Sequence, residues 1–259
     1  FVAVALSGSF PGMNIAVYAA LYTMELDPVV TCSVGASGWG ATDPDFTWLD
    51  MERLFFEEGV FEFRSVAASH GGGNDMGRGL SETGRQKILD AMHRNEVPSL
   101  RSSNLEDAIT QRMALYEEKA RGRLYRAYVN VGGGLASIGH AENRYMIPLG
   151  LSFDLGPKNW PLKGCLNLFA DKGVPVIHYL SLQTLARQSG LPVAPEVMPD
   201  VGEGEILLRE SYRLGLAFTF FVLYAAELWR RPHYHFYGFL LVLFAILLWQ
   251  PWPTTIHSP

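Results

Sequence analysis

The sequence predicts an α/β fold, with an open, mostly parallel sheet that carries helices on both faces, and a C-terminal transmembrane helical hairpin. Short β-branched apolar runs alternate with longer helical patterns from residue 1 to about residue 199. Small-residue loops follow several of these runs. The stretch 214–252 contains only three charged residues, Glu227, Arg230 and Arg231. The first two observations predict the sheet, and the third predicts the hairpin.

Five strands and the helices between them are expected in chain order. The strands are predicted at 2–6, 28–34, 63–68, 125–131 and 174–178. The helices are predicted at 13–26, 46–58, 82–95 and 105–119, with a last one ending at Gly190. This repeated order of strand, loop and helix is Rossmann-like. We expect the loops to meet at the carboxyl edge of the sheet and to form one cleft there.

The C-terminal segment 206–259 is predicted to cross the membrane twice, at about 213–229 and 233–252, after a globular domain at 1–205. The lipid bilayer is then a partner, and the protein is a multi-pass protein of the cell membrane. Arg230 and Arg231 in the turn favour an extracytoplasmic globular domain, whereas Arg209 and Arg213 favour the opposite orientation. A helical hairpin buried in a soluble core is the alternative. Because the chain opens at Phe1, we expect it to be a piece of a longer protein.

Composition excludes several classes of protein. A chain of 259 residues with 48% hydrophobic content is long enough for one large domain or two small ones with a core, which excludes disorder for most of it. The charged fraction of 18% is low for a soluble protein and favours a membrane-associated portion. A net charge of −5 gives no attraction to nucleic acid, and any polyanion partner needs a local basic site. Cys32 and Cys165 are expected to be buried thiols.

The first loop, Ser7-Gly8-Ser9, lies between a predicted strand and a helix N-terminus. Its hydroxyl and backbone N–H groups can hold a carboxylate or phosphate, and Asn14 lies one turn further along. Ser7 or Ser9 as a catalytic nucleophile is the alternative. Because the Gly-x-Ser-x-Gly pattern is missing, anion binding or helix capping is favoured.

The second loop contributes three candidate ligand-binding residues, Ser37, Trp39 and Asp50, from a stretch rich in glycine, hydroxyl and acidic residues. The structural alternative places Asp50 in the first turn of a helix, where the helix dipole favours an acid. Trp39 and Ser37 have no such structural role in an open loop, so a ligand contribution and a structural one are weighed equally.

The third loop combines His70 with Arg78 and several glycines, among them Gly72. His70 can act as a general base, and Arg78 can bind a carboxylate bidentately. We expect a loop that is mobile or wraps a ligand; a flexible surface loop with a solvated histidine is the alternative. No group of residues has metal-ligand spacing, so no metal site is expected.

The fourth loop follows the strand that ends near Asn130 and contains three successive glycines, Gly132, Gly133 and Gly134. The spacings typical of a dinucleotide site and of a P-loop are both missing, so no nucleotide cofactor is expected. Backbone closing over the ligand of the other loops is a reasonable interpretation. His178, at the end of an apolar strand, is a reserve candidate, because a histidine there is more often structural.

Five runs of the sequence resemble the bacterial family called poly-gamma-glutamate system protein. They are SGSFPGMN, SVGASGWGATDPDFTWLDME, RSVAASHGGGNDMGRGL, YVNVGGGLASIG and GVPVIHYL, and a hydrophobic tail follows them. The resemblance covers about residues 4–190. It implies a role in the synthesis, export or processing of an anionic glutamate polymer in the bacterial cell envelope, as in capsule biosynthesis, with other membrane subunits as partners. It assigns no catalytic residue.

Two functions follow as expectations. The first is a membrane-anchored component that binds poly-gamma-glutamate, a glutamyl precursor or a synthase partner at its serine and glycine loops. The second is an enzyme, a serine-dependent amidase or transpeptidase acting on the γ-glutamyl polymer, with Ser7 or Ser9 as nucleophile and His70 as base. A purely structural membrane partner would leave the glycine loops without a ligand.

Overall fold

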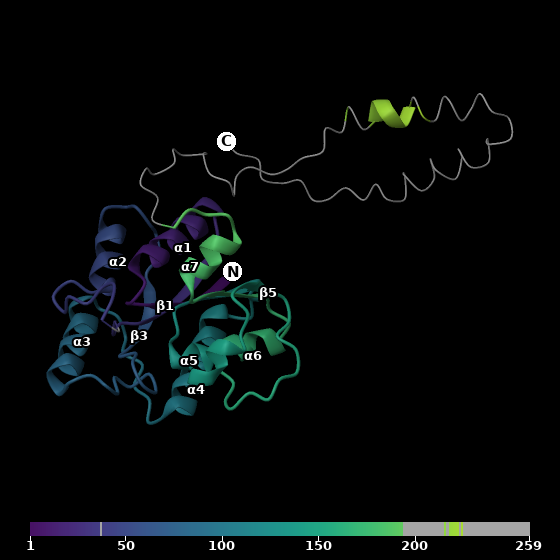
Figure 1. Cartoon of the computed structure of the whole chain (residues 1–259). Coiled ribbons are helices and arrows are strands. Elements are labelled where there is room, and N and C mark those ends of the chain that lie inside the picture. Colours follow the sequence, from purple (N-terminus) through teal and green to yellow (C-terminus); the bar gives the residue numbers. More distant parts are fainter. Residues whose placement is uncertain (37, 194–214, 216–217, 223, 225–259) are drawn as a thin grey trace. The chain divides into compact units, whose positions relative to one another are not determined.

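The computed structural model of the chain describes residues 1–36, 38–193, 215, 218–222 and 224 (Figure 1). The chain divides into two compact units, Phe1–Pro195 and Glu196–Pro259. The first unit holds the sheet. The predicted domain boundary at 205 and most of the two predicted spans lie outside the described residues. Among the residues that are described, no helix has the length and apolarity needed to cross a bilayer.

The sheet has six strands in the order β3-β2-β1-β4-β6-β5. All neighbouring pairs are parallel except β5 and β6, which are antiparallel. The strands are β1 Val2–Ser7, β2 Pro28–Ser33, β3 Ser65–Ser69, β4 Ala127–Val131, β5 Gly150–Ser152 and β6 Val176–Tyr179. This confirms the predicted α/β fold with a mostly parallel sheet.

Helices cover both faces of the sheet (Figure 1). The helices are α1 Pro11–Thr23, α2 Trp48–Glu57, α3 Glu82–Arg94, α4 Leu105–Ala120, α5 Leu135–Ile138, α6 Cys165–Asp171 and α7 Leu182–Gln188, with a 3-10 helix η1 at Ala141–Tyr145. One buried apolar cluster joins the sheet to α1, α2 and α3, and a second joins it to α4, α5 and α6. Side chains alternate along β1, so that Val4 belongs to the first cluster and Ala5 to the second.

Local sequence sets the beginnings of the longer helices. The Ser81 hydroxyl accepts a hydrogen bond from the Gly84 N–H at the start of α3, and the Asn104 side chain accepts one from Asp107 N–H at the start of α4. Helix α1 differs, because it begins with a proline and its N-cap residue, Phe10, makes no side-chain cap.

The segment between β4 and β6 holds the elements that the sequence did not predict, namely α5, η1, β5 and α6. Strand β5 has three residues and α5 has four, too few for hydrophobic periodicity to show in the sequence.

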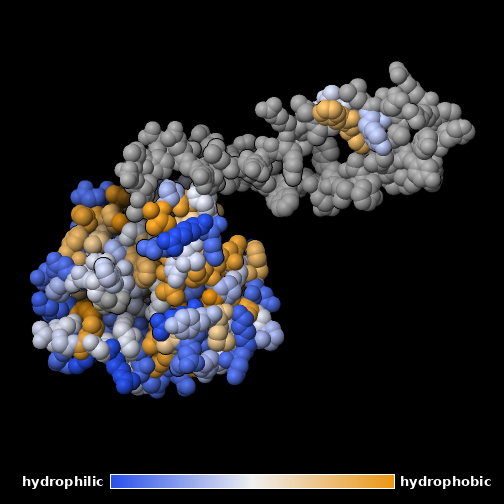
Figure 2. Space-filling view, viewed as in Figure 1, coloured by the Kyte–Doolittle hydropathy of each residue, from blue (hydrophilic) through white to orange (hydrophobic). Residues whose placement is uncertain are grey.

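The surface of the first unit includes exposed apolar side chains. Leu151 in β5 and Phe153 after it are 56% and 71% exposed. Figure 2 shows hydrophilic and hydrophobic side chains mixed over the visible face of the first unit.

A buried carboxylate ties α1, α2 and β3 together. Glu52 is 1% exposed and accepts hydrogen bonds from the Tyr18 hydroxyl at 2.5 Å, from Trp48 Nε1 at 2.7 Å and from the Ser65 hydroxyl at 2.8 Å. Burial raises the pKa of Glu52, and these donors counteract the shift. The packing of the first apolar cluster therefore depends on a polar centre with matched donors.

Replacing Tyr18 by Phe should lower the free energy of unfolding by about 1–3 kcal/mol, because a buried carboxylate loses its shortest hydrogen bond. Tyr22→Phe is the matched control, since Tyr22 lies on the same helix and is 52% exposed. Urea denaturation of both variants measures the difference. Equal losses in the two variants would contradict this role of Glu52.

Candidate functional site

The candidate site lies at the carboxyl edge of the sheet, between β1 and β4. From β1, the chain adds β2 and then β3 on one side of the sheet and afterwards adds β4 and β6 on the other side. The order in which successive strands are added therefore reverses between β1 and β4. Parallel α/β sheets bind ligands in the crevice formed where the connections diverge in this way. The loops after β1 and β4, which contain the predicted residues Ser7, Ser9 and Gly132 to Gly134, flank this position.

The β1 loop is held by its own polar groups. The Ser7 hydroxyl accepts a hydrogen bond from Ser9 N–H at 3.3 Å, and the Ser7 carbonyl accepts one from the Asn14 side chain at 3.0 Å. The loop also joins β2, because Gly8 N–H donates to the Ser33 carbonyl. Helix α1 then begins with no acid in its first turn and no side-chain cap. Its N-terminal dipole is left without a negative side chain of its own.

The β4 loop approaches the β1 loop so closely that only glycine fits. Gly132 has φ +93°, and a Cβ atom there would lie 2.9 Å from the Cβ atom of Ser7. A Cβ atom on Gly134 would lie 3.6 Å from the Ser33 hydroxyl oxygen, and one on Gly133 would lie 3.3 Å from Leu180. The glycines therefore bring the β4 backbone beside the ends of β1, β2 and β6.

The β2 and β3 loops continue this edge. Val34 N–H donates to the Ser69 carbonyl at 3.0 Å and Gly35 N–H donates to the His70 carbonyl at 2.9 Å. A Cβ atom on Gly35 would lie 2.5 Å from that carbonyl oxygen. The loops after β1, β2, β3 and β4 thus lie side by side at one edge of the sheet, which is the arrangement that the strand and loop pattern predicts.

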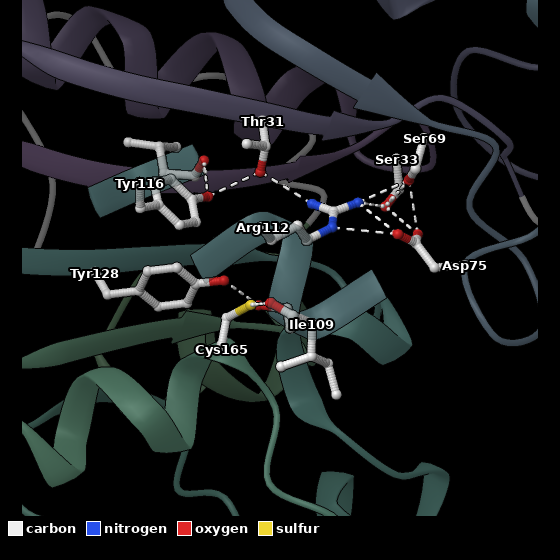
Figure 3. A network of polar contacts seen from close by, with 11 residues as sticks. Thr31, Ser33, Ser69, Asp75, Ile109, Arg112, Tyr116, Tyr128 and Cys165 are labelled. Atoms are coloured by element: carbon white, nitrogen blue, oxygen red, sulfur yellow. Dashed lines mark hydrogen bonds and ion pairs between the residues drawn. The ribbon is translucent and has the colours of Figure 1, made fainter. Parts of the chain in front are cut away.

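Beneath these loops lies a buried ion pair between Arg112 of α4 and Asp75 of the β3 loop (Figure 3). Both side chains are 2% exposed, and Arg112 Nη2 lies 2.9 Å from Asp75 Oδ2. The guanidinium group also donates to the hydroxyls of Thr31, Ser33 and Ser69. These last two hydroxyls in turn donate to Asp75 Oδ1, at 3.0 and 2.7 Å. Both oxygens of the carboxylate are therefore engaged within the network.

This network holds the glycine-rich loop in a fixed form. Gly71, Gly72, Gly77 and Gly79 adopt positive φ, as do Asn74 and Asp75. Two backbone hydrogen bonds close the loop on itself, from Gly73 N–H to the Arg78 carbonyl and from Gly77 N–H to the Gly71 carbonyl. The loop is anchored at Asp75, while Gly72 and Arg78 are exposed on its surface. That it moves or wraps a ligand stays a prediction.

The residues that build this network could have been found by one signal in the sequence. Arg112 lies at helical spacing within the buried stripe of α4, whose other members are Ala108, Ile109, Met113, Tyr116 and Ala120. An arginine on a buried stripe requires a buried acid, because an unpaired charge there is strongly unfavourable. The acid, Asp75, stands in the glycine-rich run beside His70.

Asp50, one of the predicted ligand residues, is engaged by the protein itself. Its carboxylate accepts hydrogen bonds from Thr47 N–H, from the Arg94 guanidinium and from the Asn95 side chain. Although burial alone would raise the pKa of Asp50, the hydrogen bonds from Arg94, Asn95 and Thr47 lower it to about 2. Its position in the first turn of α2 agrees with the structural alternative.

The other predicted residues of the β2 and β3 loops differ in exposure. Trp39 is 80% exposed, and Ser37 lies outside the described residues. His70 is half-buried, and burial lowers the pKa of its imidazole. The Asp75 carboxylate, the acid closest to His70 in sequence, directs its oxygens to Arg112, Ser33 and Ser69. The hydrogen bonds of Asp75 therefore go to these residues, and none joins Asp75 to His70 among the described residues.

Asn130 and His178 form a buried pair below the β4 loop. The Asn130 side-chain amide donates to the Gly132 carbonyl at 2.7 Å and to His178 Nδ1 at 2.9 Å. The neutral imidazole then carries its proton on Nε2, which has no partner among the described residues. Burial lowers the pKa of His178 to about 4. Asn130, predicted as a ligand residue, thus supports the Gly132 backbone from below.

Within the part of the chain that the structure describes, no three His, Cys, Asp or Glu side chains lie together as a metal-binding group. Both cysteines are buried free thiols, as predicted. Comparisons with protein-family models, curated proteins and solved structures find no match to this chain.

Replacing Asp75 by Asn should lower the free energy of unfolding by about 3–5 kcal/mol, because it leaves the Arg112 charge buried without a counter-charge. Hydrogen exchange of residues 70–79 should accelerate in this variant. Glu117→Gln is the control: it removes the exposed Glu117–Lys172 pair and should cost less than about 1 kcal/mol. A variant that keeps the wild-type exchange of the loop would contradict the anchoring role.

The stability of the domain should fall as the pH is lowered from 6.5 towards 4. Because the folded pKa of His178 is about 4 and the ordinary value for histidine is 6.5, the unfolded chain takes up the proton first, and the folded state loses about 3 kcal/mol over this window. Because the pKa of Glu52 is raised, protonation of Glu52 favours the folded state as the pH falls and opposes the effect of His178. This contribution is the same in all variants. The quantity to measure is therefore the difference between wild type and His178→Leu.

Denaturation at several pH values between 4 and 7.5 should give a flatter stability curve for His178→Leu than for wild type. His93→Gln, which replaces an exposed histidine in the last turn of α3, is the control for general histidine effects. Parallel curves for wild type and His178→Leu would rule out the buried imidazole as the source.

Proposed function

We propose that the domain binds a carboxylate of a γ-glutamyl ligand at the carboxyl edge of the sheet, beside the β1 and β4 loops, as a component of a poly-gamma-glutamate synthesis, export or processing system. The observation that carries the proposal is the uncapped N-terminus of α1 beside the serine loop, where the strand order of the sheet turns from β2 to β4. Helix N-termini at such positions bind anions through backbone N–H groups and the helix dipole.

The electrostatics of α1 support an anionic ligand. The first turn of α1 has neither an acid nor a side-chain cap, in contrast to α3 and α4, where Ser81 and Asn104 cap the helix and acids follow. An anion placed at the start of α1 is stabilised by the dipole, by about 0.3–1 kcal/mol when exposed and more when partly buried. The Ser7 hydroxyl, which accepts a hydrogen bond from Ser9 N–H, can donate its own proton to such an anion.

The fixed backbone of the β4 loop supports close contact with the ligand. Asn130 holds the Gly132 carbonyl, and Gly132 leaves no side chain between the two loops. A loop held in its binding conformation loses little conformational entropy when a ligand binds. The ligand is poly-gamma-glutamate or a glutamyl precursor, each of which presents carboxylates.

The cellular setting in this proposal follows the resemblance and the apolar C-terminal segment. The chain is anchored in the cell membrane by more than one span, the globular domain is extracytoplasmic, and other membrane subunits of the system are its partners. Stretches of this apolarity and length are typical of membrane helices.

Gly132→Ala should weaken the binding of labelled poly-gamma-glutamate by at least about tenfold, because a Cβ atom 2.9 Å from Ser7 forces the two loops apart. Gly122→Ala is the matched control. It has φ +81°, so its backbone strain is similar, but its Cβ atom would meet nothing within 4 Å. Fluorescence anisotropy on the full chain measures the affinity, and equal effects of the two variants would contradict this location.

A serine-directed covalent probe distinguishes binding from catalysis. Reversible polymer binding without labelling is the expected result. Labelling of Ser7 or Ser9 with release of glutamyl products would instead support the amidase or transpeptidase function. Absence of any polymer binding by the wild-type chain would overturn the proposed function.

A further inference from the structure

The sheet edge beyond β3 is extended by a short segment that precedes α4. Ala68 N–H donates to the Pro98 carbonyl at 2.8 Å, and Leu100 N–H donates to the Ala68 carbonyl at 2.7 Å. Ala68 and Ser99 form a parallel bridge. Continuing this register by two residues along both segments places Arg101 beside His70, at the same carboxyl edge as the four loops.

A second basic residue approaches His70 from the loop side. A Cβ atom on Gly77 would lie 3.3 Å from the Cβ atom of His70 and 3.0 Å from Cγ of Arg85. The pKa of His70 is lowered first by burial, and the positive charges of Arg101 and Arg85 contribute in the same direction. Arg78 follows Gly77 directly and is exposed. Three arginines therefore gather around this end of the edge.

The charges of these arginines are not equally available. Arg85 donates to the Leu80 carbonyl and forms an ion pair with Glu82. The guanidinium groups of Arg78 and Arg101 are exposed and form no hydrogen bond or ion pair with another described residue. The backbone of Arg101 is fixed, since its carbonyl accepts a hydrogen bond from the Gln111 side chain.

Two acids near this end of the edge are engaged by other groups. Asp75 is held by Arg112, and Asp107 accepts hydrogen bonds from Ser103 and Gln111. Arg78 and Arg101 thus present two positive charges on fixed backbone, and the neighbouring carboxylates do not neutralise them by ion pairing.

We propose that Arg78 and Arg101 form a second anion subsite, which binds a carboxylate of another residue of the same polymer whose first carboxylate lies beside the β1 and β4 loops. This inference rests on the proposed function. Adjacent strands are about 4.8 Å apart, so the position between the ends of β1 and β4 and the end of β3 are separated by roughly 10–15 Å along the sheet edge. In a γ-linked chain every residue keeps a free carboxylate, so one extended polymer can reach both places. A γ-linked glutamyl dipeptide is too short to reach both.

The test compares ligands of different length on the full chain. Affinities for a γ-linked glutamyl dipeptide and for long poly-gamma-glutamate are measured for wild type, Arg78→Gln and Arg101→Gln. Arg126→Gln is the matched control, because Arg126 is exposed and lies immediately before β4, at the opposite edge of the sheet. The three substitutions remove the same charge from exposed positions, so all three variants should fold, as circular dichroism can verify. Polyphosphate of matched length serves as a polyanion without carboxylates.

We expect Arg78→Gln and Arg101→Gln each to weaken binding of the long polymer by about three- to tenfold, and to leave the dipeptide affinity unchanged. Arg126→Gln should change neither. The subsite is overturned if the long polymer keeps its affinity, if the dipeptide loses as much as the polymer, or if Arg126→Gln has the same effect. An equal loss for polyphosphate would show general charge attraction in place of a carboxylate subsite. A wild-type chain that binds neither glutamyl ligand would overturn the proposed function itself.

Discussion

The edge of the sheet depends on one buried ion pair, between Asp75 and Arg112. Arg112 belongs to a helix on one face of the sheet, and its guanidinium joins the ends of β2 and β3 to the glycine-rich loop. A buried ion pair often contributes no more to stability than apolar side chains of the same volume. Apolar side chains in its place would not orient the loops. A guanidinium does, because it donates along fixed axes to a carboxylate and three hydroxyls. The pair is therefore best understood as a device that sets the positions of the loops.

The Asp75–Arg112 ion pair explains how a glycine-rich loop can be held in one conformation here. Glycine permits the positive φ angles that Gly71 and Gly77 adopt, and in a free chain the same permissiveness would make the loop mobile. The Asp75 carboxylate removes this freedom, and Asn130 does the same for the Gly132 backbone. Both loops lie at the carboxyl edge of the sheet, and both are held from below by a buried side chain. A site organised in this way loses less entropy on binding a flexible polymer than one formed by loose loops.

The sequence predicts the architecture better than the interactions at the site. Strands β1, β2 and β4 are runs of buried apolar residues, so their positions follow from composition alone. Strand β5 is too short for such a pattern, and its antiparallel pairing with β6 depends on contacts between distant segments. Asp50 and Asp75 illustrate the same limit, because both are acids near a loop. Their partners, Arg94 and Arg112, are far away in sequence, so the pairing becomes visible only in the folded chain.

Net charge gives the arrangement of basic groups its significance. A chain with a net charge of −5 repels a polyanion at long range, and this repulsion is screened beyond about 8–10 Å at physiological salt. Binding of such a polymer therefore requires short-range groups that act inside that distance. The dipole of α1 and the two exposed arginines satisfy this condition at one edge of the sheet. Because each is weak alone, the specificity that we propose for an extended carboxylate chain would come from their spacing, since only a ligand long enough to reach both gains from both.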